Sequence, residues 1–286
     1  MGNEANWNTF TQTGKVSDYL AYVREEKGRN GWENAAKKRG GHVKERVTGM
    51  VLSAATIGEY DKRVVLLTKE RGRISAFARG ARRPRSPLSA ATEPFTFGEF
   101  FIYRGRDSYS IEQVEVENYF PELRQNLEHL YLALYFCEVA DYFTREGMTA
   151  KHELNLLYLS LRALSVPSLP EELVRYIYEF RMLAIAGEAP RIFECIRCGK
   201  TENLHHFYVG DAGIVCDDCH DGKTGILLSE TAIYTLQRIL SSPLQKLYTF
   251  SVSEAVLFQL KEVVSRYFKA HTDRVFHSLD MLDIEF

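Results

Sequence analysis

Four of the five cysteines in this chain form two identical short pairs, and this pattern constrains the fold more than any other feature. Two residues separate the members of each pair, and seventeen residues separate the pairs. A Cys-x2-Cys step brings two thiolates to one tetrahedral cation, so the pattern predicts a four-cysteine structural zinc site. The glycine after the second cysteine, Gly199, suits a knuckle that needs a positive φ. The predicted ligands are Cys195, Cys198, Cys216 and Cys219.

Two other interpretations of the pairs are two disulfides or a redox-active Cys-x2-Cys motif. Neither explains why both pairs share one spacing, and nothing marks the chain as secreted. Four protein ligands complete a tetrahedral site and leave no position for water or substrate. We therefore expect the zinc to support a fold and not a reaction. The fifth cysteine, Cys137, lies in an apolar run (130–139) and is expected to be buried.

The length and composition are typical of a soluble protein. At 286 residues the chain has room for two domains of about 100–200 residues each. Residues 1–19 are polar, and no stretch reaches the ~18 apolar residues of a membrane span. We expect a cytoplasmic protein with reduced thiols and no membrane partner.

The net charge of −2 hides a strong asymmetry along the chain. Residues 62–106 carry eleven Lys and Arg against three acids, a local balance of +8. Residues 107–286 carry sixteen basic and twenty-seven acidic residues, a balance of −11. This segregation indicates that one part of the chain meets a polyanion and the other part meets something else.

From Val47 onward the sequence pattern is that of short strands, with β-branched residues, short alternation of apolar and polar residues, and frequent glycine and proline breaks. Five strands in about 70 residues predict a small closed barrel, for which the OB-fold is the usual five-stranded form. The expected strands are 47–54, 63–68, 73–79, 97–104 and 108–116.

After Pro121 the apolar spacing becomes helical, and serines stand at the expected N-caps of the last two helices, 229–240 and 253–271. The predicted fold class is therefore α+β and multi-domain: a five-stranded OB-fold barrel, then an all-helical domain with an inserted four-cysteine zinc finger. The expected limits are 1–45 for an N-terminal extension and linker, 46–119 for the OB-fold, 120–191 and 224–286 for the two parts of the helical domain, and 192–223 for the zinc finger.

Several motifs follow one another in a characteristic order. They are Val47-Thr-Gly-Met-Val-Leu-Ser, Gly58-Glu-Tyr-Asp-Lys, Leu67-Thr-Lys-Glu-Arg-Gly-Arg-Ile-Ser-Ala, Arg79-Gly-Ala-Arg-Arg-Pro-Arg-Ser, Glu93-Pro-Phe-Thr-Phe-Gly-Glu-Phe and Arg274-Val-Phe-His-Ser-Leu-Asp-Met-Leu. With the zinc knuckles, they resemble the bacterial recombination mediator family RecO over about residues 46–286. The resemblance implies an OB-fold, a helical domain and a zinc-finger-like insertion.

The same resemblance implies a role and partners. It implies a protein that binds single-stranded and double-stranded DNA and anneals complementary strands. Such a protein would also help load the recombinase RecA onto strands coated by single-strand-binding protein. It implies two direct protein partners: the toroidal mediator RecR and the C-terminal tail of single-strand-binding protein. A bacterial, nucleoid-associated location is then expected.

Residues 1–45 depart from this resemblance, because family members usually begin close to Val47. The segment that starts at Trp7 (7–20) resembles a short YqzL-like protein, which suggests a fusion or a joined upstream reading frame.

The basic barrel region supports DNA binding on physical grounds. An OB barrel binds single strands with cations that follow the phosphates and aromatic rings that stack on bases. The candidate DNA-binding cations are Lys62, Arg63, Arg71, Arg73, Arg79, Arg82, Arg83, Arg85, Arg104 and Arg106, and the stacking candidates are Tyr60, Phe77 and Tyr103.

The loop around Arg82, Arg83 and Arg85 is the main candidate, because its glycine and prolines keep the charges from being buried. The alternatives are a solvated basic face for the cations and core packing for each ring. Phe101 and Tyr103 lie on one face of their strand, so both rings are core or both are exposed.

No enzyme motif is complete, so we expect no catalytic site. The two Gly-Lys-Thr tripeptides lack the glycine of a phosphate loop, and no His-x-Glu accompanies the cysteines. Two functions remain: a DNA-binding recombination mediator, or a zinc-ribbon adaptor that binds protein. Candidate partner-binding cations on the helices are Arg124, Arg162, Arg175 and Arg181, for which ordinary surface ion pairs are the alternative.

Overall fold

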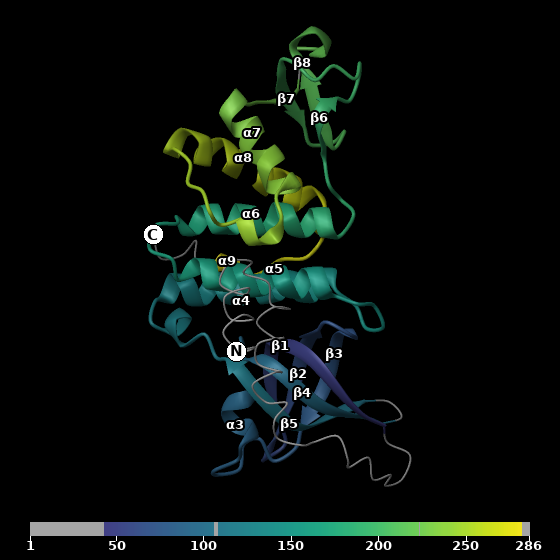
Figure 1. Cartoon of the computed structure of the whole chain (residues 1–286), viewed down its shortest axis with the longest axis vertical. Coiled ribbons are helices and arrows are strands. Elements are labelled where there is room, and N and C mark those ends of the chain that lie inside the picture. The colour runs from purple at the N-terminus through teal and green to yellow at the C-terminus, as the bar shows by residue number, and fades with distance from the viewer. Residues whose placement is uncertain (1–42, 106–107, 223, 282–286) are drawn as a thin grey trace, which may run out of the picture.

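The protein consists of a β-barrel, a layered helical body and a small zinc-ribbon-like sheet, stacked along the long axis of the molecule (Figure 1). The computed structural model describes residues 43–105, 108–222 and 224–281. Residues 7–20, for which a YqzL-like resemblance is expected, lie outside these ranges. Of the expected N-terminal extension (1–45), the structure describes only residues 43–45, which begin the first strand. Among the described residues, no helix combines the length and apolar character needed to cross a bilayer.

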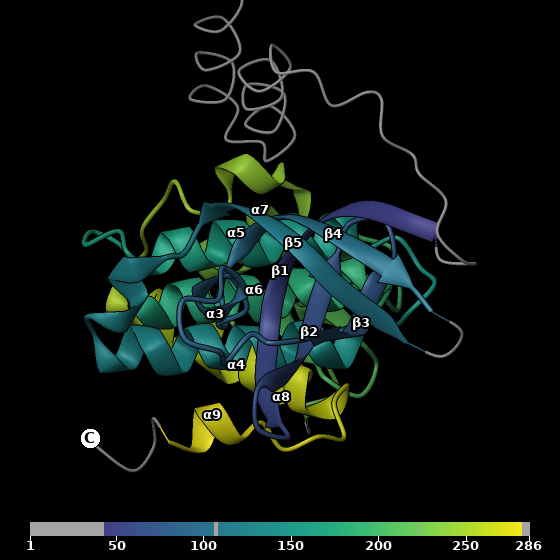
Figure 2. The same ribbon diagram turned by 90° about the horizontal axis from the view of Figure 1, so that it is seen from below.

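Five strands close the barrel in the order β1-β2-β3-β5-β4, which confirms the predicted five-stranded barrel. Figure 2 looks at it from the end away from the helices. The first strand is longer than expected because its first half pairs with β4 and its second half with β2. A short helix, α3 (Leu88–Ala91), follows β3. The strands are β1 (Val43–Ile57), β2 (Asp61–Thr68), β3 (Gly72–Ala78), β4 (Phe97–Arg104) and β5 (Tyr109–Asn118).

The two faces of the barrel strands serve different cores. Val51, Leu66 and Phe100 fill the interior of the barrel. Outward-facing Met50 and Leu67 instead join the core of the helical body, so the helices cover part of the outer wall. The remainder of that wall, along the first part of β1 and the second half of β4, carries exposed and half-buried polar, charged and aromatic side chains.

Helices α4, α5 and α6 form the layers above the barrel, and α7 and α8 pack on α6 (Figure 1). Asn126 caps α4, and the predicted serines Ser229 and Ser253 cap α7 and α8 through their side chains. Pro121, an expected helix start, begins only a 3-10 turn, η1 (Pro121–Arg124). The helices are α4 (Leu127–Phe143), α5 (Lys151–Leu164), α6 (Glu171–Ile185), α7 (Glu230–Ser241), α8 (Glu254–Ala270) and α9 (His277–Asp280).

The hairpin between β2 and β3 joins the barrel to the helices through the backbone. Three hydrogen bonds connect residues 69–73 with the segment 145–150 that follows α4. Gly72 makes this approach possible: its φ is +67°, and a Cβ there would lie 2.1 Å from the carbonyl oxygen of Arg145. Asp141 on α4 adds a side-chain link, since it accepts hydrogen bonds from Arg73 of β3 and from Arg274 near the C-terminus, each at 2.9 Å.

The zinc-ribbon-like sheet lies between α6 and α7 in the sequence, which confirms the predicted insertion into the helical domain. Its strand order is β6-β8-β7-β9. The ribbon strands are β6 (Arg191–Cys195), β7 (Leu204–Tyr208), β8 (Gly213–Cys216) and β9 (Ile226–Leu227), with a 3-10 turn, η2 (Asp217–Cys219), between β8 and β9.

Candidate metal centre and nucleic-acid interface

The four predicted metal ligands converge at the end of the ribbon. Their Sγ atoms all lie within 4.8 Å of one another, and those of Cys198 and Cys216 are 3.7 Å apart. Zn–S bonds of about 2.3 Å place the sulfurs of a tetrahedral site about 3.8 Å apart, so the arrangement fits zinc. All five cysteines of the chain are unpaired thiols, which argues against the disulfide interpretation.

The chain around the first knuckle prepares a thiolate. Gly199 has the positive φ, +76°, expected of its position, and its N–H donates to the carbonyl of Cys195. Burial opposes ionisation of Cys195, but backbone hydrogen bonds from Cys216, Cys198 and Arg197 outweigh it and lower its pKa to about 6. A metal bound here binds thiolates and releases the remaining thiol protons.

Two histidines lie within hydrogen-bonding distance of the turn that carries the second cysteine pair. His205 and His206 on β7 both lie about 3.0 Å from the carboxylate of Asp217, which is next to the ligand Cys216. His206 also stacks on His220, with ring centroids 3.7 Å apart. The histidines therefore orient the turn between the ligands, as supports and not as ligands themselves.

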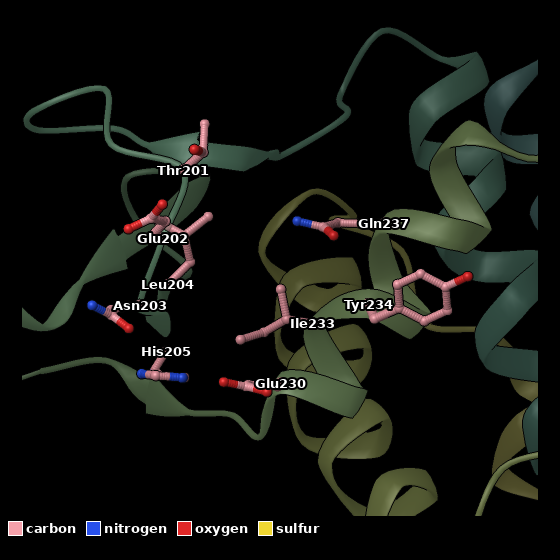
Figure 3. A pocket seen from close by; sticks show the side chains of 9 residues that line it. All are labelled: Thr201, Glu202, Asn203, Leu204, His205, Glu230, Ile233, Tyr234 and Gln237. Atoms are coloured by element: carbon pink, nitrogen blue, oxygen red, sulfur yellow. The ribbon is translucent and has the colours of Figure 1, made fainter.

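A cleft of about 390 Å³ separates the ribbon from α7 (Figure 3). Leu204 and Ile233 form its apolar floor, while Glu202 and Glu230 are exposed at its rim. Neither glutamate has an ion-pair partner among the described residues. The negative rim repels phosphate, so DNA is not expected to contact the molecule here.

The arginine loop, residues 79–87, wraps beside the turn between β1 and β2. Arg82 donates to the carbonyl of Glu59 at 3.0 Å, and the guanidinium of Arg83 lies 5.5 Å from the centre of the Tyr60 ring. The arginines Arg79, Arg82, Arg83 and Arg85 are all exposed and have no carboxylate partner among the described residues. The loop is therefore held in place without neutralising its charge.

Three other predicted cations are occupied by acids of this chain. Lys62 pairs with Glu93 at 2.6 Å, and Arg71 makes a two-bond contact with Glu45. Arg73 pairs with Asp141 at the junction with the helices. DNA would have to displace these partners, so these three residues are weaker candidates than the loop. Arg63 and Arg104 are exposed, and Arg106 lies outside the described residues.

On the outer face of β1 and β4, aromatic rings lie close to lysine and arginine side chains. Phe101 and Tyr103 are both half-buried on the outside of the barrel. Alternation left open whether both rings were in the core or both were exposed, and the structure places both outside the barrel core. The ammonium group of Lys44 lies 5.5 Å from the Phe101 ring centre and 5.9 Å from that of Tyr103. Arg46 also lies over Phe101. Sequence reasoning missed Lys44 and Arg46, because only strand pairing brings them to these rings.

The partner-binding cations expected on the helices are mostly committed within the chain. Arg175 pairs with buried Glu179 at 2.7 Å, and Arg124 donates to the carbonyl of Pro94. Arg181 donates to the carbonyls that end α7. Of these four arginines, only Arg162 is exposed and makes no side-chain hydrogen bond or ion pair with another described residue.

Comparison with known proteins agrees with this architecture. The family models described as Recombination protein O N terminal and Recombination protein O C terminal match residues 43–120 and 124–280. Curated relatives named DNA repair protein RecO occur in Acetivibrio thermocellus, 33% identical over 83% of this chain and 95% of the relative, and in Symbiobacterium thermophilum, 32% identical over 83% and 96%. The relative of that name in Bacillus subtilis is 28% identical over 82% of this chain and 92% of its own length. This chain belongs to the RecO family of DNA repair proteins.

Proposed function

We propose that the protein is a DNA-binding recombination mediator whose barrel holds the phosphate backbone, with no catalytic activity of its own. The observation that carries the proposal is the arginine loop, which presents four exposed guanidinium groups without a carboxylate partner among the described residues. Charge that a fold leaves unneutralised on a stiff loop is available to a polyanion. Arginine forks also suit phosphate, which they bind with two hydrogen bonds.

The proposed activity is to bind single-stranded and double-stranded DNA, to anneal complementary strands and to help load RecA at the nucleoid. A structural zinc would stabilise the ribbon, which lies at the far end of the molecule from the barrel (Figure 1). The DNA surface and the metal centre are then independent parts of one chain.

The acidic part of the chain is proposed to contact protein partners. A RecR-like mediator and the tail of single-strand-binding protein are the candidates. Arg162 is the available helical cation for an acidic tail, whereas the cleft beside the ribbon suits a basic side chain. The stem of a lysine or arginine would lie on the floor formed by Leu204 and Ile233, with its charge between Glu202 and Glu230.

That cleft also favours the second candidate function, a zinc-ribbon adaptor that binds protein and not DNA. Titration of the full chain with a labelled single strand at several salt concentrations separates the two. A mediator releases counterions from phosphates, so the logarithm of its binding constant falls linearly with the logarithm of salt, by about 0.7 per phosphate contact. An adaptor shows no DNA binding at any salt concentration.

A further inference from the structure

Strand pairing places one row of residues around the outside of the barrel, across all five strands. Arg63 on β2 is the partner of Phe77 on β3, and Phe77 is the partner of Ser110 on β5. Ser110 is also the partner of Tyr103 on β4, and Tyr103 is the partner of Lys44 on β1. Directly paired residues lie on the same face of a sheet, so these five side chains form a continuous transverse row.

The row faces outward along its whole length. Arg63 and Lys44 are exposed, and the three residues between them are half-buried. Six of their chain neighbours belong to the core inside the barrel, as the alternation of a strand requires. The buried neighbours are Val64, Ala76, Ala78, Ile102, Tyr109 and Ile111.

The spacing within the row leaves room for the two rings to stack on different bases of one single strand. Neighbouring strands lie about 4.8 Å apart, so the rings of Phe77 and Tyr103 stand about 10 Å from each other with only a serine between them. A small residue in that position lets a backbone approach the sheet. Aromatic side chains in such a row stack on bases irrespective of sequence.

The two ends of the row differ in whether their cation is neutralised by a carboxylate. At one end, Arg63 donates through Nε to the hydroxyl of Ser75 and has no carboxylate partner among the described residues. Phe77 is followed two residues later by Arg79, which begins the arginine loop. At the other end, Lys44 is neutralised by Glu112 at 2.6 Å. Phosphates are therefore held best at the Arg63 end, next to the loop.

We propose that this row, with Phe77 and Tyr103 as its two stacking rings, is the part of the barrel that selects unpaired bases over duplex DNA. The inference rests on the proposed function and adds a division of labour to it. The arginine loop grips phosphate in any DNA, whereas the row binds only where base faces are open. In a duplex those faces are covered by neighbouring bases, so the rings gain nothing from it.

The test compares three probes on the full chain: a single strand, the same strand with abasic sites in place of its bases, and a duplex. Phe77→Ala and Tyr103→Ala are each expected to weaken binding of the intact single strand about 5- to 150-fold. Binding of the abasic strand and the duplex should change less than about twofold. Tyr119→Ala is the matched control, because Tyr119 is 45% exposed but lies outside the row.

Phe77→Leu and Tyr103→Leu keep apolar volume without a stacking face, so they should show the same selective loss with an unchanged melting temperature. A Tyr103→Trp reporter in a chain that also carries Trp7→Phe and Trp32→Phe should be quenched by the single strand and not by the duplex. Failure of the unaltered chain to bind any DNA overturns the proposed function and this inference together. If it binds DNA but the ring variants lose nothing, or lose duplex and single strand equally, the inference alone is overturned.

Discussion

Asp141 links three segments of the chain, and its replacement by asparagine measures how firmly the barrel is held on the helices. Its carboxylate accepts hydrogen bonds from Arg73 of the barrel and Arg274 near the C-terminus. The Asp141→Asn variant keeps the size of the side chain but removes the charge that both arginines face. We expect it to fold with the same secondary structure and a lower stability.

The solvent exposure of Arg73 and Arg274 determines how much stability the Asp141→Asn variant should lose. Removing one partner of a fully buried ion pair costs about 3–5 kcal/mol. The side chains of Arg73 and Arg274 are 41% and 43% exposed, so water reaches both once the carboxylate is lost. With solvent screening taken into account, the loss should be about 2 kcal/mol. In a chain of this size that corresponds to a Tm lower by about 4–8 °C.

The effect should depend on pH in one direction. Burial opposes ionisation of Asp141, but its hydrogen bonds with Arg274 and Arg73 outweigh burial and hold its pKa below the ordinary value. A lowered pKa in the folded state contributes stability above the unfolded pKa of about 3.9, and this contribution is lost as pH falls through the folded pKa. The difference in Tm between the unaltered chain and Asp141→Asn should therefore be full at pH 7 and shrink below about pH 3.9.

Thermal unfolding followed by circular dichroism is the assay. The control is Arg266→Ala, which breaks an exposed ion pair with Glu262 within α8 and should change stability by less than about 0.5 kcal/mol. An Asp141→Asn variant with the Tm of the unaltered chain at pH 7 would refute the reasoning. A difference that grows on acidification would refute it too.

Two further predictions concern other parts of the fold. Cys198→Ser should abolish zinc binding, as measured by elemental analysis. It should also expose the ribbon to protease while leaving DNA affinity unchanged. Zinc contributes on the order of 10 kcal/mol to the folding of isolated fingers, but the adjoining helical body should reduce the loss of stability here. A purified, unaltered chain without zinc would contradict the metal assignment. Gly72→Ala should lower Tm by more than Gly58→Ala, because both glycines have positive φ but only Gly72 has backbone oxygens of Arg145 and Met148 within 2.6 Å of the added Cβ. Equal losses in the two variants would show that the approach of the hairpin to the helices is not tight.

The four-cysteine cluster and the barrel were predictable because their signals are local. Cysteine spacing fixes a knuckle without any knowledge of the rest of the fold, and strand alternation identified Phe101 and Tyr103 as residues of one face. Alternation could not say which face was outside, because that depends on where the helices pack. Met50 and Leu67 show the difficulty: both are as apolar as core residues, yet they point out of the barrel into a second core.

The candidate DNA surface was predictable only in part. The arginine loop was found from its glycine and prolines. Arg71 and Arg73 appeared equivalent to it in sequence, but Glu45 and Asp141, 26 and 68 residues away, neutralise them in the fold. Lys44 was missed for the same reason, since only its register with Tyr103 shows its position. Contacts of this kind depend on pairing between distant segments, which composition and spacing do not record.

The salt dependence of single-strand binding by a loop variant tests the central claim most directly. Arg82, Arg83 and Arg85 are replaced together by alanine in the full chain, and the control replaces three exposed cations of α8, Lys261, Arg266 and Lys269. The loop variant should bind more weakly to every sequence, with a salt slope flatter by about two units, at about 0.7 per lost phosphate contact. Its Tm should stay close to that of the unaltered chain, because none of the three side chains is buried. The α8 control should keep the original slope. An unchanged slope and affinity in the loop variant, or an equal loss in the control, would contradict the account.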